Sequence, residues 1–83
     1  MKIVYYSVVY MLYMFKPKYF VKHCTSAREY LKFIRDNPAI EKIDTIVDSK
    51  QHWETLENLV DEINHGKIDR ETLLKKLESI HKK

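Results

Sequence analysis

The chain of 83 residues contains one glycine, two prolines and one cysteine, and each low number excludes a class of protein. A single cysteine excludes an internal disulfide framework and is typical of a reducing compartment, so we expect a cytoplasmic protein. Gly66 stands alone, which excludes a glycine-rich loop that would hold a phosphate group. The length predicts a single small domain that spans residues 1–83.

Charge is missing from the thirteen residues between Ile3 and Phe15. A membrane-spanning helix needs about 20 apolar residues, whereas this stretch stops at Lys16-Pro17-Lys18. A secretory leader would need small residues at a cleavage site, whereas Lys-Pro-Lys-Tyr-Phe follows Phe15. Because aromatic and β-branched residues dominate the stretch, we predict a long strand and no membrane partner.

Both faces of this predicted strand are apolar, so each of them needs a cover. At ~3.3 Å per residue the strand would also exceed 40 Å, which is long for a small domain. The strand could bend near Ser7, or it could pair with a second copy of itself. We therefore expect a homodimer, because an open apolar edge invites aggregation. The residues predicted for the dimer or partner interface are Tyr5, Tyr6, Val8, Tyr10, Leu12 and Met14.

The rest of the chain predicts a hairpin partner, three helices and a third strand. The second strand is expected over Tyr19–Cys24, after a turn at Lys16-Pro17-Lys18, and the third over Lys42–Val47. Helices are expected from Ser26, with Glu29 at capping-box spacing, from Asp48, with Gln51 at the same spacing, and from Asp69. Asn37-Pro38 and Gly66 end the first two helices.

These elements predict an α+β fold. Its order is ββαβαα, and its small three-stranded sheet contains the long N-terminal strand in a hairpin. The second strand, the first helix and the third strand would form a βαβ unit.

No group of residues predicts catalysis, a cofactor or a metal ion. His23 and Cys24 are neighbours on a strand, so their side chains point to opposite faces and the histidine cannot serve the thiol as a base. No histidine or cysteine pair has a recognised ligand spacing. We therefore expect a protein that is not an enzyme.

Basic residues are concentrated in the first part of the chain. Residues 1–36 hold seven basic and two acidic side chains, whereas residues 37–83 hold eight basic and ten acidic ones. Lysines interleaved with aromatic residues on a hairpin suit phosphate contacts and base stacking, and a basic helix stripe would extend them. The residues of this predicted nucleic-acid site are Lys16, Lys18, Tyr19, Lys22, Arg28, Lys32 and Arg35. The alternative is that these lysines guard a strand edge.

An acidic stripe on the second predicted helix consists of Glu54, Glu57 and Asp61. It would suit a basic protein surface, and a solvated helix face explains it equally well. The leading hypothesis is a non-catalytic protein-binding module, namely a homodimeric small regulator or an inhibitor of the kind that mobile elements carry. The alternative hypothesis is a nucleic-acid-binding protein that uses the basic hairpin 16–22 and the basic stripe of the first helix.

Overall fold

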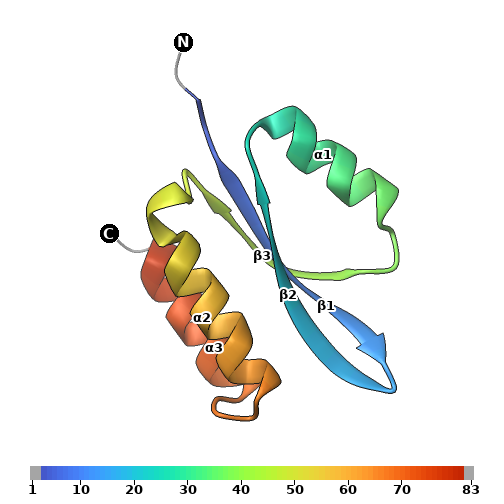
Figure 1. The fold of residues 1–83 in the computed structure, drawn as a ribbon, viewed down its shortest axis with the longest axis vertical. Coiled ribbons are helices and arrows are strands. Elements are labelled where there is room, and N and C mark those ends of the chain that lie inside the picture. Colours follow the sequence, from blue (N-terminus) through green and yellow to red (C-terminus); the bar gives the residue numbers. More distant parts are fainter. Residues whose placement is uncertain (1–2, 82–83) are drawn as a thin grey trace.

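The computed structural model describes residues 3–81, which form three strands and three α-helices (Figure 1). The predicted α+β class and the order ββαβαα are confirmed. A short 3₁₀ turn, η1, precedes the second helix. The elements are β1 (Tyr6–Met14), β2 (Lys16–Cys24), α1 (Ala27–Asp36), β3 (Glu41–Val47), η1 (Lys50–His52), α2 (Trp53–Asn64) and α3 (Arg70–His81).

The strand β1 lies in the middle of the sheet, whose order is β2-β1-β3, and pairs antiparallel with both neighbours. Its pairing with β2 runs from Tyr6–Cys24 to Met14–Lys16. Its pairing with β3 ends at Met11–Glu41 and contains an irregularity between Val9 and Tyr10. The strands β2 and β3 are therefore not neighbours, and the predicted βαβ unit is present only in a split form with β1 between its strands.

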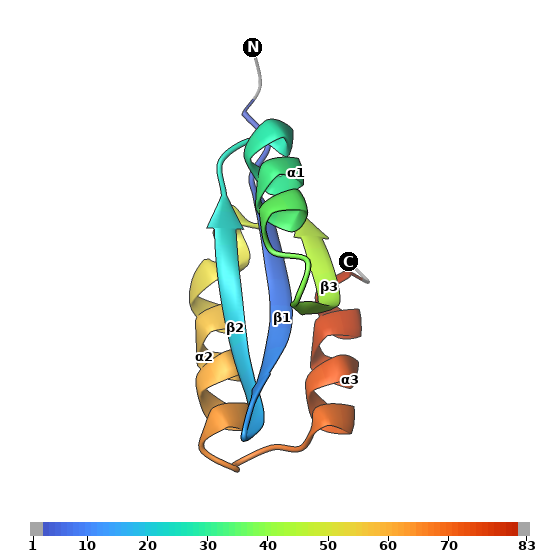
Figure 2. The same ribbon diagram turned by 90° about the vertical axis from the view of Figure 1, so that its right-hand side faces the viewer.

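The helices cover the sheet from opposite sides (Figures 1 and 2). Ring contacts place α1 over the even-numbered residues of β1, because Tyr30 stacks on Tyr6 and Phe33 lies against Tyr10. We call this side the α1 face. The helices α2 and α3 cover the other side, where the main core forms from Val9, Met11, Tyr19, Ile46, Leu56, Leu59, Val60, Leu73 and Leu77.

The hairpin turn lies two residues earlier than the sequence predicts. Phe15 alone separates β1 from β2, and Pro17 lies inside β2 opposite Tyr13. Proline fits there because β2 is an edge strand. The Tyr19 N–H points away from β1 to the Asn64 side chain, so the alternating pattern also directs position 17 outward, where no ladder bond is lost.

The predicted caps are correct at two helices and wrong at one. The Glu29 N–H donates to Ser26 Oγ at the start of α1, and the Thr72 N–H donates to Asp69 Oδ1 at the start of α3. Asp48 does not cap α2, because it has a φ of 55° in the left-handed region and η1 comes between. Gly66 ends the α2 segment with a φ of 74°, as glycine readily does.

The helices of this one chain enclose the middle of β1 on both faces. Val8 and Val9 point to opposite sides of the sheet, and neither has any exposed surface. Cover for both faces of the apolar stretch therefore comes from the chain's own helices, except at the hairpin end. Among the described residues, no helix combines the length and apolar character that a membrane crossing requires.

Candidate binding surfaces

The end of the β1–β2 hairpin carries three consecutive exposed apolar side chains. Tyr13 is 72% exposed, Met14 is 57% exposed and Phe15 is 103% exposed. We call these three residues the hairpin tip. The other large exposed hydrophobic residues of the described chain are scattered, so the tip is where apolar surface gathers.

The tip is bare because its neighbours stop short of it. The strand β3 pairs with β1 only as far as Met11, so Leu12, Tyr13 and Met14 are paired on the β2 side alone. The hairpin end therefore extends past α1 as a two-stranded ribbon, whereas the end of α2 lies beside the start of β2 (Figures 1 and 2). This extension leaves the tip free to enter a partner's surface.

Phe15 has a backbone conformation that disfavours its own side chain. Its φ is 64°, in the left-handed region that glycine or asparagine occupies at little cost. A bulky residue there costs ~1–2 kcal/mol. The side chain does not recover this cost by burial, because it is fully exposed. A strained and exposed aromatic residue is typical of a functional position rather than a structural one.

Beside the tip, a hollow of about 420 Å³ separates the start of β2 from the end of α2. Lys16, Pro17 and Lys18 line one side, and Asp61 and His65 are among the residues on the other. The hollow therefore combines cationic and acidic walls, and it adjoins the apolar tip.

The six predicted interface residues fall into two groups. Leu12 is half-buried and Met14 is exposed at the hairpin end, in keeping with a contact there. Val8 has no exposed surface, so it cannot touch a partner while α1 is in place. Tyr5, Tyr6 and Tyr10 are half-buried against Trp53, Tyr30 and the pair Phe20–Phe33, respectively.

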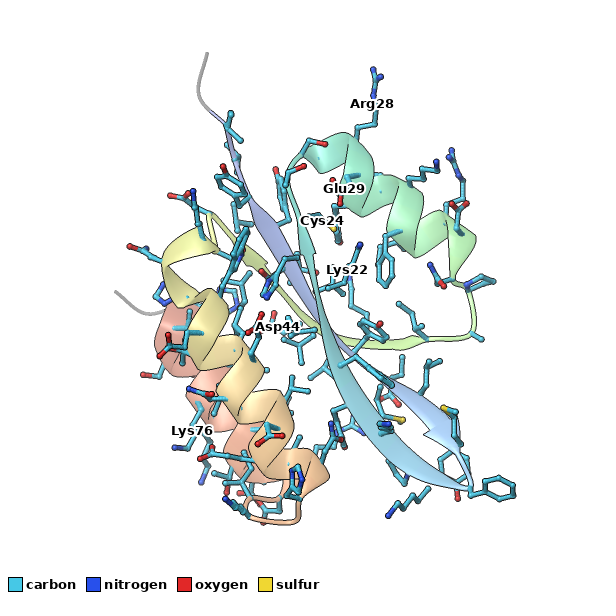
Figure 3. The ribbon with its side chains drawn as sticks, viewed as in Figure 1. Lys22, Cys24, Arg28, Glu29, Asp44 and Lys76 are labelled. Atoms are coloured by element: carbon cyan, nitrogen blue, oxygen red, sulfur yellow. The ribbon has the colours of Figure 1, made fainter. Side chains whose placement is uncertain are left out.

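Of the seven predicted nucleic-acid residues, six lie on the same side of the sheet and one does not. The register places Lys16, Lys18 and Lys22 on the α1 face, and α1 itself carries Arg28, Lys32 and Arg35. Figure 3 shows Arg28 directed away from the sheet and Lys22 beside α1. Tyr19 is on the opposite face and only 7% exposed, so it belongs to the core and offers no ring for stacking.

The predicted acidic stripe lies along α2, which packs on the opposite side of the sheet from α1 (Figure 2), and its Asp61 borders the hollow that Lys16 and Lys18 also line. Glu54 is exposed, whereas Glu57 accepts from His23 Nε2 at 2.9 Å and Asp61 contacts His65 Nδ1 at 3.2 Å. Two of its three carboxylates therefore already have partners within the chain.

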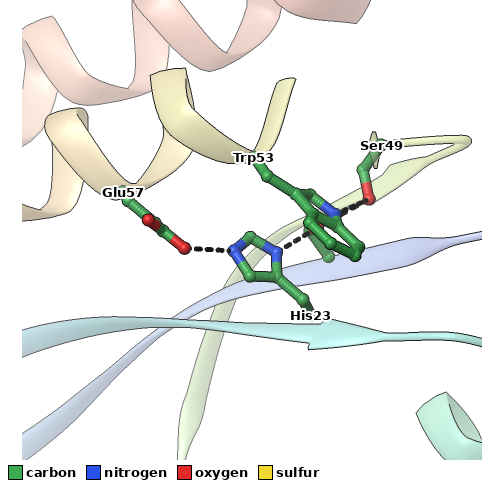
Figure 4. Close-up of polar contacts among 5 residues, drawn as sticks. His23, Ser49, Trp53 and Glu57 are labelled. Carbon is green, nitrogen blue, oxygen red and sulfur yellow. Dashed lines mark hydrogen bonds and ion pairs between the residues drawn. The ribbon is translucent and has the colours of Figure 1, made fainter. Parts of the chain in front are cut away.

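Sequence reasoning did not find a chain of polar contacts that joins β1, β2 and α2 (Figure 4). His23 Nδ1 lies 2.8 Å from Ser7 Oγ, and Ser7 Oγ lies 2.6 Å from Ser49 Oγ. One set of proton positions satisfies every member, with each hydrogen bond donated in the same direction. It runs from the Trp53 Nε1–H through the hydroxyls of Ser49 and Ser7 to His23 Nδ1, and from the His23 Nε2–H to Glu57.

Ser7, His23 and Glu57 have the order of groups found in a serine nucleophile with its base and orienting carboxylate. Ser7 has no exposed surface, however, and its oxygen is already bonded to Ser49. His23 is also covered, because Trp53 stacks on its ring at 4.7 Å. A substrate carbonyl has no path to Ser7, so the arrangement acts as a buried structural contact.

The remaining groups offer little chemistry. Cys24 has no exposed surface, and burial raises the pKa of its thiol, which disfavours the reactive thiolate. Within residues 3–81, no three histidine, cysteine or carboxylate side chains gather in a way that would hold a metal ion.

Comparison with protein-family models, with curated proteins and with solved structures finds no match to this chain.

Proposed function

We propose that this protein is a non-catalytic protein-binding module whose contact surface is the hairpin tip. The observation that carries the proposal is Phe15, which is fully exposed in a strained backbone conformation between two other exposed apolar residues. Large aromatic and Met side chains are enriched where proteins bind each other. A tip of this size would act as the anchor of a contact, inserted into a pocket on the partner.

The arrangement fits a small regulator or inhibitor better than an enzyme. The exposed end of the hairpin would enter a cleft of another protein with its apolar side chains first. The Ser–His–Glu contact does not argue against this proposal, because Ser7 is sealed from solvent.

A comparison of two matched variants in affinity capture from the native cell or its host tests the proposal. Phe15→Asn removes the tip ring, and Leu31→Gln removes a side chain of α1 that is 63% exposed. Both changes exchange an apolar group for an amide. We expect one protein to be captured by the wild type and by Leu31→Gln, and to be lost with Phe15→Asn. Capture that is identical for all three chains, or no specific capture, would reject the tip as the contact.

The predicted homodimer is the simplest form of this proposal, in which the tip meets a second copy. Its contact would involve Leu12 and Met14 of the original set together with Tyr13 and Phe15. Light scattering on a size-exclusion column would show a dimer for the wild type at micromolar concentration and a monomer for Phe15→Asn. A monomeric wild type would exclude self-association at that concentration and leave a different protein as the partner.

A further inference from the structure

The two sides of the sheet carry opposite charges. The α1 face and α1 together hold seven cations, against the two carboxylates of Glu29 and Asp36. The cations are Lys16, Lys18, Lys22, Arg28, Lys32, Arg35 and Lys42. The helices α2 and α3 on the other side together hold six carboxylates against the three cations Arg70, Lys75 and Lys76. A molecule polarised in this way attracts a polyanion to one side only.

Three of these cations form a regular row with an aromatic ring in it. Lys16, Lys18, Phe20 and Lys22 are alternate residues of β2, and their pairing with Met14, Leu12, Tyr10 and Val8 places them all on the α1 face. Alternate residues of a strand are ~6.6 Å apart. This repeat is comparable with the distance between successive phosphates of an extended polynucleotide.

Other aromatic rings support Phe20, the third residue of the row. Phe20 stacks on Tyr10 at 5.4 Å, and Tyr10 lies 5.3 Å from Phe33 of α1. Lys18 Nζ is 5.6 Å from the centre of the Phe20 ring. Phe20 is half-buried, so this support fixes the ring while part of it stays open to solvent at the edge of the sheet. A fixed aromatic ring beside lysines is the arrangement that stacks a nucleobase.

We propose that the α1 face binds single-stranded nucleic acid, with Lys16 and Lys18 on successive phosphates, Phe20 stacked on a base and Lys22 on a phosphate further along the strand. Arg28, Lys32 and Arg35 extend the positive field over α1. An acidic polypeptide would satisfy the lysines but would have no base for Phe20. The row begins at Lys16, which pairs with Met14 of the tip, but none of its side chains belongs to the tip, so the inference does not depend on the proposed protein contact.

Fluorescence anisotropy with a labelled single-stranded 12-mer, as DNA and as RNA, tests this inference at 50 and 200 mM salt. Three phosphate contacts predict a slope of log affinity against log salt of about −2, which corresponds to a loss of roughly tenfold to twentyfold between the two salt concentrations. An unlabelled duplex of the same length and poly-glutamate serve as competitors. We expect the single strand to compete best and poly-glutamate to compete poorly.

Two pairs of charge reversals separate this site from general charge attraction. Lys16→Glu with Lys18→Glu reverses two exposed cations of the row, and Lys67→Glu with Lys76→Glu makes the same charge change elsewhere (Figure 3 shows Lys76 on α3). We expect the first pair to lower affinity at least tenfold and to reduce the salt slope by about 1.4. The second pair should change affinity less than threefold.

Phe20→Leu tests the stacking contact and should lower affinity about tenfold with the salt slope unchanged. Thermal melts followed by circular dichroism show whether each variant is folded. If Phe20→Leu does not fold, the two charge pairs test the nucleic-acid site without it. No binding at 50 mM salt, equal losses for the two charge pairs, or equally good competition by poly-glutamate would overturn the inference.

Discussion

The Asn64 side chain bonds both backbone groups of Tyr19, as a neighbouring strand would. Asn64 Oδ1 accepts from the Tyr19 N–H and Asn64 Nδ2 donates to the Tyr19 carbonyl, each at 2.8 Å. Tyr19 lies in the edge strand β2, two residues after Pro17, which has no N–H to offer. Proline and asparagine together therefore protect this part of the edge against pairing with another chain.

Asn64→Ala should lower the free energy of unfolding by about 1 kcal/mol, because two hydrogen bonds are lost at a site that water can reach. The open edge should also make the variant aggregate faster on heating. Urea unfolding and light scattering measure the two effects. Asn58→Ala on the exposed side of α2 is the matched control and should be at least as stable as the wild type, because alanine is the better helix former. Equal unfolding midpoints for both variants would show that the Tyr19 contact adds nothing.

Phe15→Asn should stabilise the protein by about 1 kcal/mol, because asparagine tolerates a positive φ better than phenylalanine does. The fully exposed ring contributes no burial that the variant would lose. Asp48→Asn is the control, since Asp48 has a φ of 55° and aspartate already tolerates that region. Urea unfolding should show a higher midpoint for the first variant only. A lower midpoint would mean that Phe15 makes a stabilising contact in solution.

The sequence predicts the elements well where the signal is local. Ser26 and Asp69 predict the starts of α1 and α3, and in the structure their side chains accept hydrogen bonds from backbone N–H groups there. The sequence predicts the turn at Lys16-Pro17-Lys18, because proline usually interrupts a strand. That rule fails at an edge position whose N–H would point outward, and edge status depends on strand order.

The contacts that decide strand order and site geometry are distant in sequence. His23 and Glu57 are 34 residues apart, and Tyr19 and Asn64 are 45 residues apart. Neither pair belongs to a sequence motif of fixed spacing, so no local pattern predicts these contacts. The surplus of apolar residues in β1 was visible in the sequence, but the division into an enclosed middle and a bare tip required the positions of β3 and α1.

Ser7 should not react with a fluorophosphonate, although it is bonded to a histidine that contacts a carboxylate. Its side chain has no exposed surface, and its oxygen is held by Ser49. Mass spectrometry of the treated native protein should find no label on Ser7. Ser7→Ala should cost about 1–3 kcal/mol of stability, because His23 Nδ1 would lose its buried donor. Labelling of native Ser7 that Ser7→Ala abolishes would show that the site opens.

The acid sensitivity of the fold should come in part from two helix starts. Hydrogen bonds from the Thr25 hydroxyl and amide lower the pKa of Glu29 below its ordinary value of 4.5. Hydrogen bonds from Thr72 lower the pKa of Asp69 below 3.8. A depressed folded-state pKa means that the stabilisation is complete above the ordinary value and is lost as the pH falls through the folded-state value.

Glu29→Gln with Asp69→Asn should therefore flatten the decline in stability below about pH 4.5, because the amides do not titrate in this range. Asparagine is a good N-cap, so Asp69→Asn should change the stability at pH 7 only slightly. Urea unfolding at pH 7, 5, 4 and 3 gives the slopes. Glu62→Gln is the control, since its side chain accepts no hydrogen bond among the contacts of residues 3–81, and it should keep the wild-type slope. An unchanged slope in the double variant would place the acid sensitivity at other carboxylates.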